Sequence, residues 1–230
     1  MTKDKITVII PAFNEQNSIA KVIQDIPRER VREIVVVNNN SNDNTVKNAR
    51  AAGATVLQED RQGYGFACLK GIKYVSQIAE PPDVVVFMDA DYSDHPEELP
   101  QVVQPILDDQ ADLVIGSRAL GERERGSMTI PQVFGNWLAT RLLKWLYGAT
   151  FTDLGPFRAI RYRSLVQLNM QDTTYGWTVE MQLKAARQGL RCTEVPVRYR
   201  QRIGVSKVSG TVKGTIMAGY KIIWTIVKYL

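Results

Sequence analysis

Short apolar runs alternate with longer amphipathic segments along the first half of the chain. The apolar runs predict buried strands at residues 6–11, 34–37, 55–57, 84–88 and 113–115. Strands that are separated by helices are typical of a mostly parallel sheet, because each crossover helix returns the chain to the same edge. The pattern therefore predicts an α/β fold with helices on both faces of a central sheet. Ligands of such folds bind beyond the carboxyl ends of the strands.

Capping residues mark the helices between these strands. Asn17 or Ser18 begins the first helix, and Asp43 begins the second, which Gly53 ends. A third helix is expected over 66–76, and Pro96 opens a fourth. These boundaries agree with the strand positions and complete the alternating pattern.

The second half departs from this rhythm. A polar, glycine-containing stretch at 121–129 predicts a mobile loop. Helices are expected over 133–147, 178–188 and 212–230, with an extended segment at 191–199. Without an internal repeat or a low-complexity linker, residues 1–230 are interpreted as one domain. It divides into segments 1–115, 116–211 and 212–230.

Composition narrows the class of protein. With 44% hydrophobic and 23% charged residues, the chain resembles a globular protein, which excludes collagen-like, disordered and disulfide-scaffold classes. Cys68 and Cys192 form no paired spacing, and the N-terminus lacks a signal-peptide pattern, so a cytoplasmic location is expected. The net charge of +5 is unevenly distributed. Residues 1–115 carry 11 Lys/Arg and 18 Asp/Glu, whereas residues 116–230 carry 18 and 6.

Two carboxylates follow the apolar strand at 84–88. Asp89 and Asp91 are separated by one residue at the predicted carboxyl end of that strand. Divalent cations such as Mg²⁺ prefer oxygen ligands, and they often combine one or two carboxylates with substrate phosphates. The pair therefore predicts a metal site, although an isolated Asp-x-Asp is often incidental. His95 is the only histidine, which excludes a mechanism that needs a histidine triad.

Polar turns follow the first two strands. Residues 11–15 come after the first strand, and Asn38 and Asn39 open the turn after the second. Asn and Asp often occupy turns because they bond their own backbone. Since both turns converge on one sheet edge, they also fit a base-and-ribose pocket. Gly63 and Gly65 mark a helix entry where bare backbone could approach a ligand, but the third glycine of a dinucleotide fingerprint is absent.

A basic run lies in the second half. Arg198, Arg200 and Arg202 alternate along the predicted extended segment, so one edge could present all three to phosphates. The other interpretation is a solvated basic surface. A nucleic-acid partner is not expected, because the first half is acidic and no recognition motif occurs.

Together these segments resemble family 2 glycosyltransferases of the nucleotide-diphospho-sugar transferase fold, most of all the dolichyl- and polyprenyl-phosphate hexosyltransferases. The resemblance covers nearly the whole chain. Its motifs are residues 11–15, 38–45, 63–67, 89–96, 116–118, 152–158, 176–181 and 202–207. It implies a Rossmann-like fold of the glycosyltransferase A type. It also implies metal-dependent, inverting transfer of a hexose from a UDP-glucose or GDP-mannose type of donor to a polyprenyl-phosphate-like acceptor.

The resemblance assigns roles to individual residues. Those expected to bind the donor nucleotide are Pro11, Ala12, Glu15, Asn38, Asn39, Gly65 and Asp89. Asp89 and Asp91 would hold Mg²⁺ or Mn²⁺. Arg202, Ser206 and Lys207 would bind the diphosphate, and Arg118 would face the acceptor phosphate.

Two departures from the family pattern leave alternatives open. Asn38 and Asn39 stand where the family usually has two aspartates, so uracil and guanine both remain candidate bases. Met128 and Gln132 stand where dolichyl-phosphate enzymes tend to carry arginine and serine. The first alternative is therefore transfer to a hydroxyl of a soluble or glycan acceptor, with Asp153 or Glu180 as general base. A non-catalytic nucleotide-sugar-binding module is the second.

The C-terminal segment 212–230 has the length of a membrane span but contains three lysines, Lys213, Lys221 and Lys228. These charges argue against a transmembrane helix. On a helical projection the lysines share one sector, with abundant apolar residues elsewhere, as expected for a helix at a lipid interface. Peripheral contact with the inner face of the cell membrane is therefore expected. The alternative is a helix packed on the core or on a second copy in a homodimer.

Overall fold

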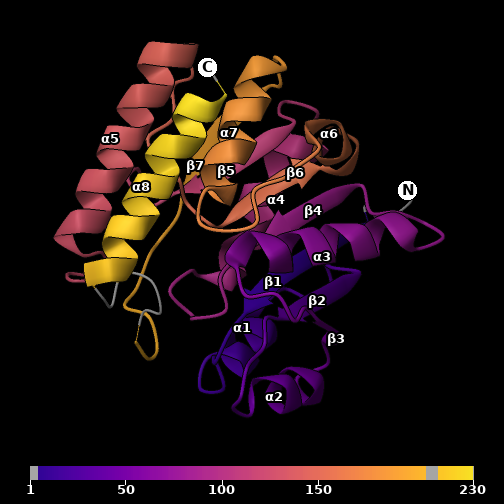
Figure 1. Cartoon of the computed structure of the whole chain (residues 1–230). Coiled ribbons are helices and arrows are strands. Elements are labelled where there is room, and N and C mark those ends of the chain that lie inside the picture. The colour runs from indigo at the N-terminus through magenta and orange to yellow at the C-terminus, as the bar shows by residue number, and fades with distance from the viewer. Residues whose placement is uncertain (1–4, 206–211, 230) are drawn as a thin grey trace.

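A mixed seven-stranded sheet forms the centre of the molecule (Figure 1), as seen in a computed structural model that describes residues 5–205 and 212–229. The strands are β1 (Ile6–Ala12), β2 (Glu33–Asn38), β3 (Thr55–Gln58), β4 (Val84–Phe87), β5 (Leu113–Ser117), β6 (Arg158–Arg161) and β7 (Cys192–Pro196). Their spatial order is β3-β2-β1-β4-β6-β5-β7. Every neighbouring pair is parallel except those of β6, which runs antiparallel to β4 and β5. The predicted mostly parallel α/β sheet is confirmed.

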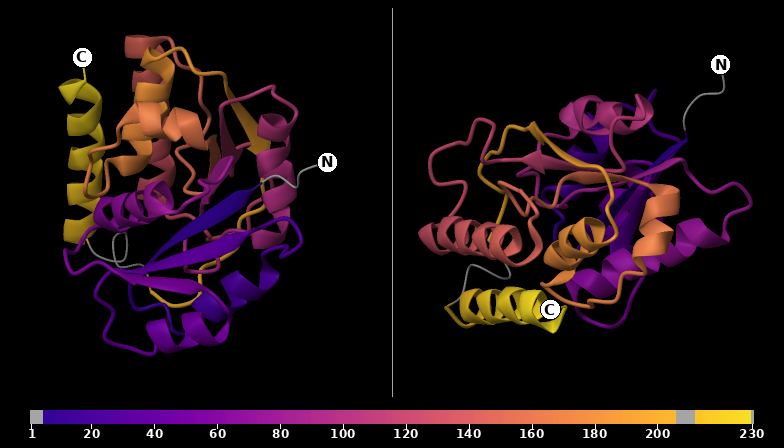
Figure 2. Two further views of the ribbon diagram at one scale, coloured as in Figure 1. Left: turned by 90° about the vertical axis from the view of Figure 1, so that its right-hand side faces the viewer. Right: turned by 90° about the horizontal axis from the view of Figure 1, so that it is seen from above.

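Helices cover both faces of this sheet (Figure 2). One face carries α1 (Ile19–Asp25), α2 (Thr45–Ala51) and α4 (Leu99–Leu107), the last of which follows a short 3₁₀ helix at Pro96–Glu98. The other face carries α3 (Tyr64–Gln77), α5 (Ile130–Tyr147), α6 (Tyr162–Leu168), α7 (Trp177–Arg187) and α8 (Val212–Lys228). Because both faces are covered, β1 and β4 are buried along their whole lengths, which explains why their sequences are continuously apolar rather than alternating.

Helix boundaries follow local side-chain chemistry. The N-cap of α2 is Asn44, one residue after the predicted Asp43, although Asp43 accepts hydrogen bonds from the backbone N–H and the hydroxyl of Thr45 at the start of the helix. Helix α5 begins at Ile130, three residues before the prediction, because Thr129 and Gln132 form a reciprocal capping box. The hydroxyl of Ser18, in contrast, donates to Glu15 and does not cap α1.

Two elements were missed by the sequence pattern. Strand β6 reads Arg-Ala-Ile-Arg, with a charged residue at each end, and α6 follows it directly. Arg158 is nevertheless fully buried in this strand, where its guanidinium donates to the carbonyl oxygens of Leu154, Gly155 and Thr178. These bonds fix the 154–158 segment to the start of α7. An arginine, a residue type that is usually exposed, therefore stabilises a buried strand.

Candidate active site

Two adjoining cavities lie at the carboxyl ends of the central strands. The first has a volume of about 330 Å³ and is lined by Pro11, Ala12, Phe13, Glu15, Asn39, Gln62, Gly63, Tyr64, Ala67, Asp89, Ala90, Asp91, Tyr175 and Arg202. The second has a volume of about 310 Å³ and shares Tyr64, Asp89, Asp91, Tyr175 and Arg202 with the first. The two spaces therefore meet at the carboxylates that follow β4.

Three carboxylates gather where the cavities meet. Asp89 and Asp91 line both spaces, and Asp94 is buried beside them with its Oδ1 atom accepting no hydrogen bond within the described part of the chain. Burial, together with the charge of Asp91, raises the pKa of Asp89 to about 7. Burial and the charges of Asp89 and Asp91 also hold the pKa of Asp94 well above its usual range. The cluster thus has an excess of negative charge that a cation would relieve.

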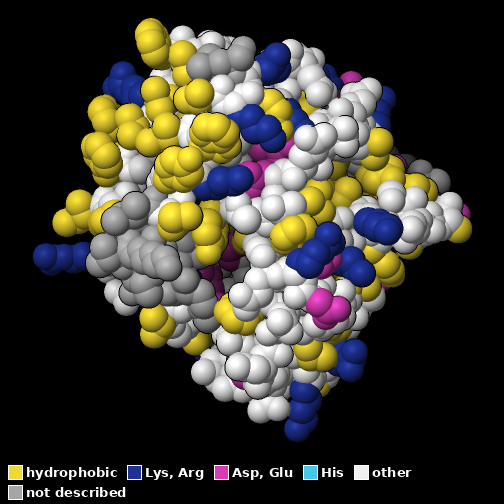
Figure 3. All heavy atoms as spheres, viewed as in Figure 1, with side chains coloured by type: hydrophobic (Ala, Val, Ile, Leu, Met, Phe, Trp, Pro, Cys, Tyr) yellow, Lys and Arg dark blue, Asp and Glu magenta, His cyan; other side chains and the backbone are white. Residues whose placement is uncertain are grey.

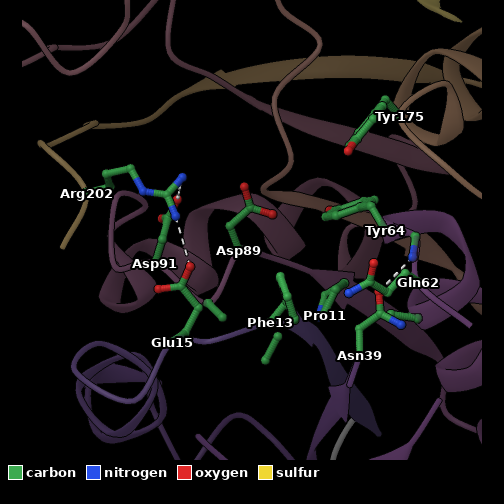
Figure 4. A pocket seen from close by; sticks show the side chains of 14 residues that line it. Pro11, Phe13, Glu15, Asn39, Gln62, Tyr64, Asp89, Asp91, Tyr175 and Arg202 are labelled. Carbon is green, nitrogen blue, oxygen red and sulfur yellow. Dashed lines mark hydrogen bonds and ion pairs between the residues drawn. The ribbon is translucent and has the colours of Figure 1, made fainter. Parts of the chain in front are cut away.

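Arg202 supplies part of the compensating charge. One nitrogen of its guanidinium lies 3.1 Å from Asp91 Oδ2 and the other lies 2.9 Å from Glu15 Oε1. Figure 4 shows both acidic side chains turned toward this arginine at one end of the cavity. The backbone N–H of Ile203 also donates to the carbonyl oxygen of Asp91, which ties the 200–205 segment to the loop after β4.

The other arginines of the basic run have different partners, which corrects the expectation that all three face phosphate together. Arg198 pairs with Glu97 and Glu98 at the surface. Arg200 stacks over the ring of Tyr92 and donates to the carbonyl oxygens of Tyr92 and Asp94. Only Arg202 of the three lines the cavities. Ser206 and Lys207 lie outside the described residues.

At the opposite end of the first cavity, the amide side chains of Asn38 and Asn39 form hydrogen bonds with other parts of the chain. The Asn39 amide donates to the carbonyl oxygens of Glu59 and Arg61, and its oxygen accepts from the N–H of Gly63. Asn38 likewise bonds Gln58 and the N–H of Ser41, and it does not line either cavity. The asparagines that follow β2 therefore shape the wall of the cavity by fixing the 59–63 segment.

The two glycines at the start of α3 have separate roles. Gly63 lines the first cavity, whereas Gly65 is buried against the 172–173 backbone. A Cβ atom at Gly65 would lie 2.1 Å from the carbonyl oxygen of Asp172. The close approach that requires glycine at this position is thus to another part of the chain, which corrects the expectation that Gly65 faces a ligand.

The second cavity is largely apolar beyond the shared residues. Its other lining residues are Arg118, Met128, Pro131, Gln132, Gly135, Asn136, Leu154, Pro156, Thr178, Tyr199, Gly219 and Ile222. Most come from the loop before α5, from α5 itself, from the 154–156 segment and from α8, while Arg118 follows β5, Thr178 lies in α7 and Tyr199 follows β7. Among the described lining residues, Asp89 and Asp91 are the only acids, and Arg118 and Arg202 are the only cations.

Arg118 is held in place by Asp153. Its backbone N–H and Nε atom donate to Asp153 Oδ2 at 2.7 and 2.8 Å, and its Nη2 atom donates to Oδ1 at 2.7 Å. Asp153 is almost fully buried, and although burial alone would raise its pKa, the charge and hydrogen bonds of Arg118 hold that pKa below its usual value. Both carboxylate oxygens of Asp153 therefore serve to orient Arg118.

The other residue considered as a base, Glu180, lies in α7 and lines neither cavity. It is fully buried, and it accepts hydrogen bonds from the backbone N–H groups of Gln171 and Asp172 and from the hydroxyl of Tyr229. Lys184 lies 2.8 Å from it in the next turn of the helix. These contacts indicate a structural role.

With this geometry established, comparison with known proteins identifies the family. The sequence matches the description "Glycosyl transferase family 2" across residues 7–168, which is more than half of the chain. The chain belongs to glycosyl transferase family 2.

Relatives of this glycosyltransferase extend over almost its full length. A dolichyl-phosphate hexose transferase from Haloferax volcanii is 33% identical, with 90% of this chain and 88% of the relative aligned. An undecaprenyl-phosphate mannosyltransferase from Micrococcus luteus is 30% identical, with 91% and 90% aligned. The predicted enzyme class, a hexose-transferring glycosyltransferase family, is confirmed at this level.

The fold of the transferase also has solved counterparts. Glucosyl-3-phosphoglycerate synthase from Mycobacterium tuberculosis, solved in complex with Mn²⁺, UDP-glucose and phosphoglyceric acid, superposes with a TM-score of 0.76. It is 24% identical, and the match covers 98% of this chain and 79% of that one. This likeness confirms the predicted glycosyltransferase A-type architecture.

The residues of the transferase fit a divalent cation only in combination with a ligand. Within residues 5–205 and 212–229, no group of three or more His, Cys, Asp or Glu side chains is arranged to hold a metal ion by itself. Asp89 and Asp91 together offer carboxylate oxygens beside Asp94, whose Oδ1 atom accepts no hydrogen bond from the described residues. A donor diphosphate would have to supply further oxygens, which is the usual way in which Mg²⁺ is bound in phosphate-transfer sites.

Several cavity residues were not singled out from the sequence. Tyr64 and Tyr175 line both cavities, Tyr199 lines the second, and Gln62 lines the first. Tyr64 lies within the 63–67 motif, whereas the other three belong to no pattern that distinguishes them from ordinary aromatic or amide residues. Asp94 lies within the 89–96 motif and could have been found as its third carboxylate.

Proposed function

We propose that this family 2 transferase moves a hexose from a nucleotide-diphospho-sugar to a polyprenyl-phosphate-like acceptor. The observation that carries the proposal is the lining of the second cavity. Arg118 offers a fixed positive charge there, the lining includes the apolar side chains of Met128, Leu154 and Ile222, and Asp89 and Asp91 are the only acids among its described residues. An anionic head group with an apolar tail matches such a lining.

The choice of a phosphate acceptor also agrees with the positions of the two residues that were considered as bases, Asp153 and Glu180. A hydroxyl acceptor needs a group that removes its proton, whereas a phosphate is already anionic at neutral pH. Asp153 is committed to Arg118, and Glu180 is buried in α7 outside the cavity. The two relatives with polyprenyl-type acceptors in their names add support.

Each part of the proposed reaction falls to particular residues. The first cavity binds the nucleotide, and its lining includes Pro11, Ala12, Glu15 and Asn39. Asp89 and Asp91 would hold Mg²⁺ or Mn²⁺, which when bound would neutralise charge on the departing diphosphate. Arg202 lies beside them and is placed to pair with the same diphosphate. We assign Ser206 and Lys207 to that group from the sequence motif alone.

In the transfer step, an oxygen of the acceptor phosphate attacks the anomeric carbon from the face opposite the diphosphate. A bond forms between that oxygen and that carbon, while the bond from the anomeric carbon to the diphosphate oxygen breaks. The electron pair leaves with the nucleoside diphosphate, so the configuration inverts. Arg118 orients the acceptor phosphate through its charge, and its own orientation comes from Asp153.

A panel of sugar nucleotides tests this proposal. Each donor is incubated with the protein and Mg²⁺ or Mn²⁺, with a short-chain polyprenyl phosphate, with 3-phosphoglycerate, or without acceptor. We expect release of the nucleoside diphosphate to depend on the polyprenyl phosphate. Stimulation by 3-phosphoglycerate alone would favour the soluble-acceptor alternative. Donor binding without turnover under every condition would favour a non-catalytic module.

A further inference from the structure

Helix α5 exposes a continuous stripe of large apolar side chains. Ile130 is 86% exposed and Trp145 is 81% exposed, and Val133, Phe134 and Trp137 are also exposed between them. Their spacing of three, four or eight residues places them on one side of the helix. The opposite side of α5 contributes Ala139 and Leu143 to the core. The stripe is therefore an outward face without a partner within the described chain.

Helix α8 lies beside α5 and extends this stripe (Figures 1 and 2). Met217, Tyr220, Trp224 and Val227 are exposed on it, whereas Thr225 and Ile226 are buried. The space-filling view shows apolar side chains gathered over these two helices (Figure 3). We call the exposed side chains of α5 and α8 together the α5–α8 face.

The charge on this face has one sign. Neither α5 nor α8 contains Asp or Glu, while they contain Arg141, Lys144, Lys213, Lys221 and Lys228. Arg141, Lys144 and Lys228 are exposed, and Lys221 pairs with Asp172 at 3.3 Å. The lysines of α8 are thus not segregated from its exposed apolar residues as the helical projection predicted, since Trp224 and Lys228 share one side. Aromatic and basic residues are intermixed, as in segments that lie in the head-group region of a bilayer.

The second cavity borders the same two helices. Gly135 and Asn136 of α5 line it from one side, and Gly219 and Ile222 of α8 line it from the other. A tail attached to a phosphate at Arg118 would therefore leave the cavity close to the α5–α8 face.

We propose that the α5–α8 face docks the protein on an anionic bilayer surface, with its aromatic residues among the head groups and the second cavity turned toward the lipid. The inference rests on the proposed function for the nature of the acceptor, although the docking itself rests on exposure and charge alone. No helix within the described residues is long and apolar enough to cross a bilayer.

Charge complementarity favours a bilayer over a second copy of the chain as the occupant. In a two-fold symmetric dimer the same patch meets itself. That contact would bring Arg141, Lys144 and Lys228 of one copy close to their equivalents in the other, without an acid in either helix to offset them. Anionic lipid head groups offset the same charges, because each Lys or Arg near the surface is attracted to them.

Co-sedimentation of the full chain with vesicles tests the docking. We expect binding to vesicles of equal parts phosphatidylcholine and phosphatidylglycerol at low salt, and little binding to phosphatidylcholine alone. The double variant Arg141→Glu/Lys144→Glu should bind the mixed vesicles at least about tenfold more weakly, because two attractive charges become repulsive. The matched control is Lys47→Glu/Arg50→Glu in α2, where Arg50 occupies the last turn as Lys144 does in α5.

An apolar pair of variants tests the second part of the face. Val227 on α8 is 50% exposed and Val166 on α6 is 53% exposed. Val227→Ser should weaken vesicle binding severalfold, whereas Val166→Ser should leave it unchanged. Equal losses in test and control variants would overturn the proposal, as would failure of the unaltered protein to sediment with mixed vesicles.

Two further measurements separate the docking from the proposed function. Transfer to a short-chain, water-soluble polyprenyl phosphate should persist in Arg141→Glu/Lys144→Glu, since neither residue lines a cavity. Vesicle binding without any transfer would refute the function and leave the docking intact. A concentration-dependent dimer that Val227→Ser dissociates, with no vesicle binding, would assign the face to a second copy and refute the docking.

Discussion

Two arginine–aspartate pairs flank the second cavity, and they are built differently. Arg118 and Asp153 are joined by three hydrogen bonds, and their side chains are 11% and 1% exposed. Arg202 makes a single contact with Asp91 and another with Glu15, and its side chain is 27% exposed. Asp153 has no free carboxylate oxygen for another ligand, because both of its oxygens accept hydrogen bonds from Arg118. The second pair faces the place where a cation and a diphosphate would bind.

This difference suggests different roles for the two pairs. The Arg118–Asp153 pair keeps a side chain in a fixed position, whereas Arg202 and Asp91 can exchange each other for a bound ligand. A buried ion pair that loses one member leaves an uncompensated charge in the interior, which is strongly destabilising. A partly exposed pair contributes little to stability, because water and salt screen it. We therefore expect loss of Asp153 to destabilise the fold as well as to release Arg118 from its orientation. Substitutions at Arg202–Asp91 should change binding and turnover with little effect on folding.

The largest effect is expected for Asp91→Asn. The substitution removes a carboxylate charge from the proposed cation site, so turnover should fall by at least about 10²–10³-fold, the range seen when a charge-stabilising group is lost. Metal-dependent binding of UDP or GDP should weaken in parallel. Steady-state release of the nucleoside diphosphate and calorimetric titration measure the two effects.

Stability of this variant sharpens the comparison. Asparagine keeps an oxygen that accepts from the N–H and hydroxyl of Ser93, and its neutrality relieves repulsion with Asp89. The free energy of unfolding should change by less than about 1 kcal/mol. Asp60→Asn, at an exposed carboxylate that lines neither cavity, is the matched control and should retain full turnover. Normal turnover of Asp91→Asn, or of the unaltered enzyme in excess EDTA, would refute the cation mechanism.

The second-largest effect is expected for Asp153→Asn, which should lower the free energy of unfolding. Arg118 would remain buried without its charged partner, which costs about 3–5 kcal/mol of unfolding free energy in comparable pairs. Urea denaturation at neutral pH measures this loss. Arg202→Gln is the comparison, and it should cost less than about 1 kcal/mol. Equal losses for both variants would contradict the distinction between the pairs.

The pH dependence of the same variant gives a second test. Arg118 holds the pKa of Asp153 below its ordinary value of about 3.8. A lowered pKa means that this carboxylate contributes stability above that ordinary value and loses it as the pH falls through the lowered pKa. Asp153→Asn has no such group, so the gap in stability between wild type and variant should narrow below about pH 4. A constant gap down to pH 2 would show that the ion pair contributes nothing.

Local patterns were sufficient to predict the first half of the fold. Each strand of that half is an apolar run, and a helix follows each of β1 to β4. Strands β1, β2 and β3 are neighbours both in sequence and in the sheet, and β4 then pairs with the other edge of β1. Strand β6 breaks this rule, since it inserts antiparallel between β4 and β5. Its charged residue Arg158 is satisfied by carbonyl oxygens from other segments, and no local pattern reveals such partners.

The candidate site was predictable to a similar degree. Asp89 and Asp91 were found because they follow a strand, and Arg118 was found through the family resemblance. All three line the second cavity. The prediction that Arg198, Arg200 and Arg202 face phosphate together was wrong. Their partners lie about a hundred positions away in the sequence or more, so no local pattern reveals them. The outward stripe on α5 was missed for a related reason. Exposure depends on which helix face the rest of the molecule covers.

The smallest effects are expected for Arg202→Gln. This substitution should change the affinity for Mn²⁺ and the affinity for UDP in opposite directions. In the protein alone, the Arg202 guanidinium occupies Asp91 Oδ2 and so competes with a cation for that oxygen. Its removal should tighten binding of Mn²⁺ alone by roughly two- to fivefold, the scale of a partly exposed ion pair. Binding of UDP in the presence of Mn²⁺ should weaken instead, because the diphosphate loses its arginine partner.

Arg198→Gln, whose native partners are Glu97 and Glu98, is the control and should change neither affinity. Titration of Mn²⁺ followed by electron paramagnetic resonance, with and without UDP, measures both. If Arg202→Gln weakens Mn²⁺ binding in the absence of nucleotide, then the arginine supports the cation site rather than competing for it, and the contrast with the closed Arg118–Asp153 pair fails.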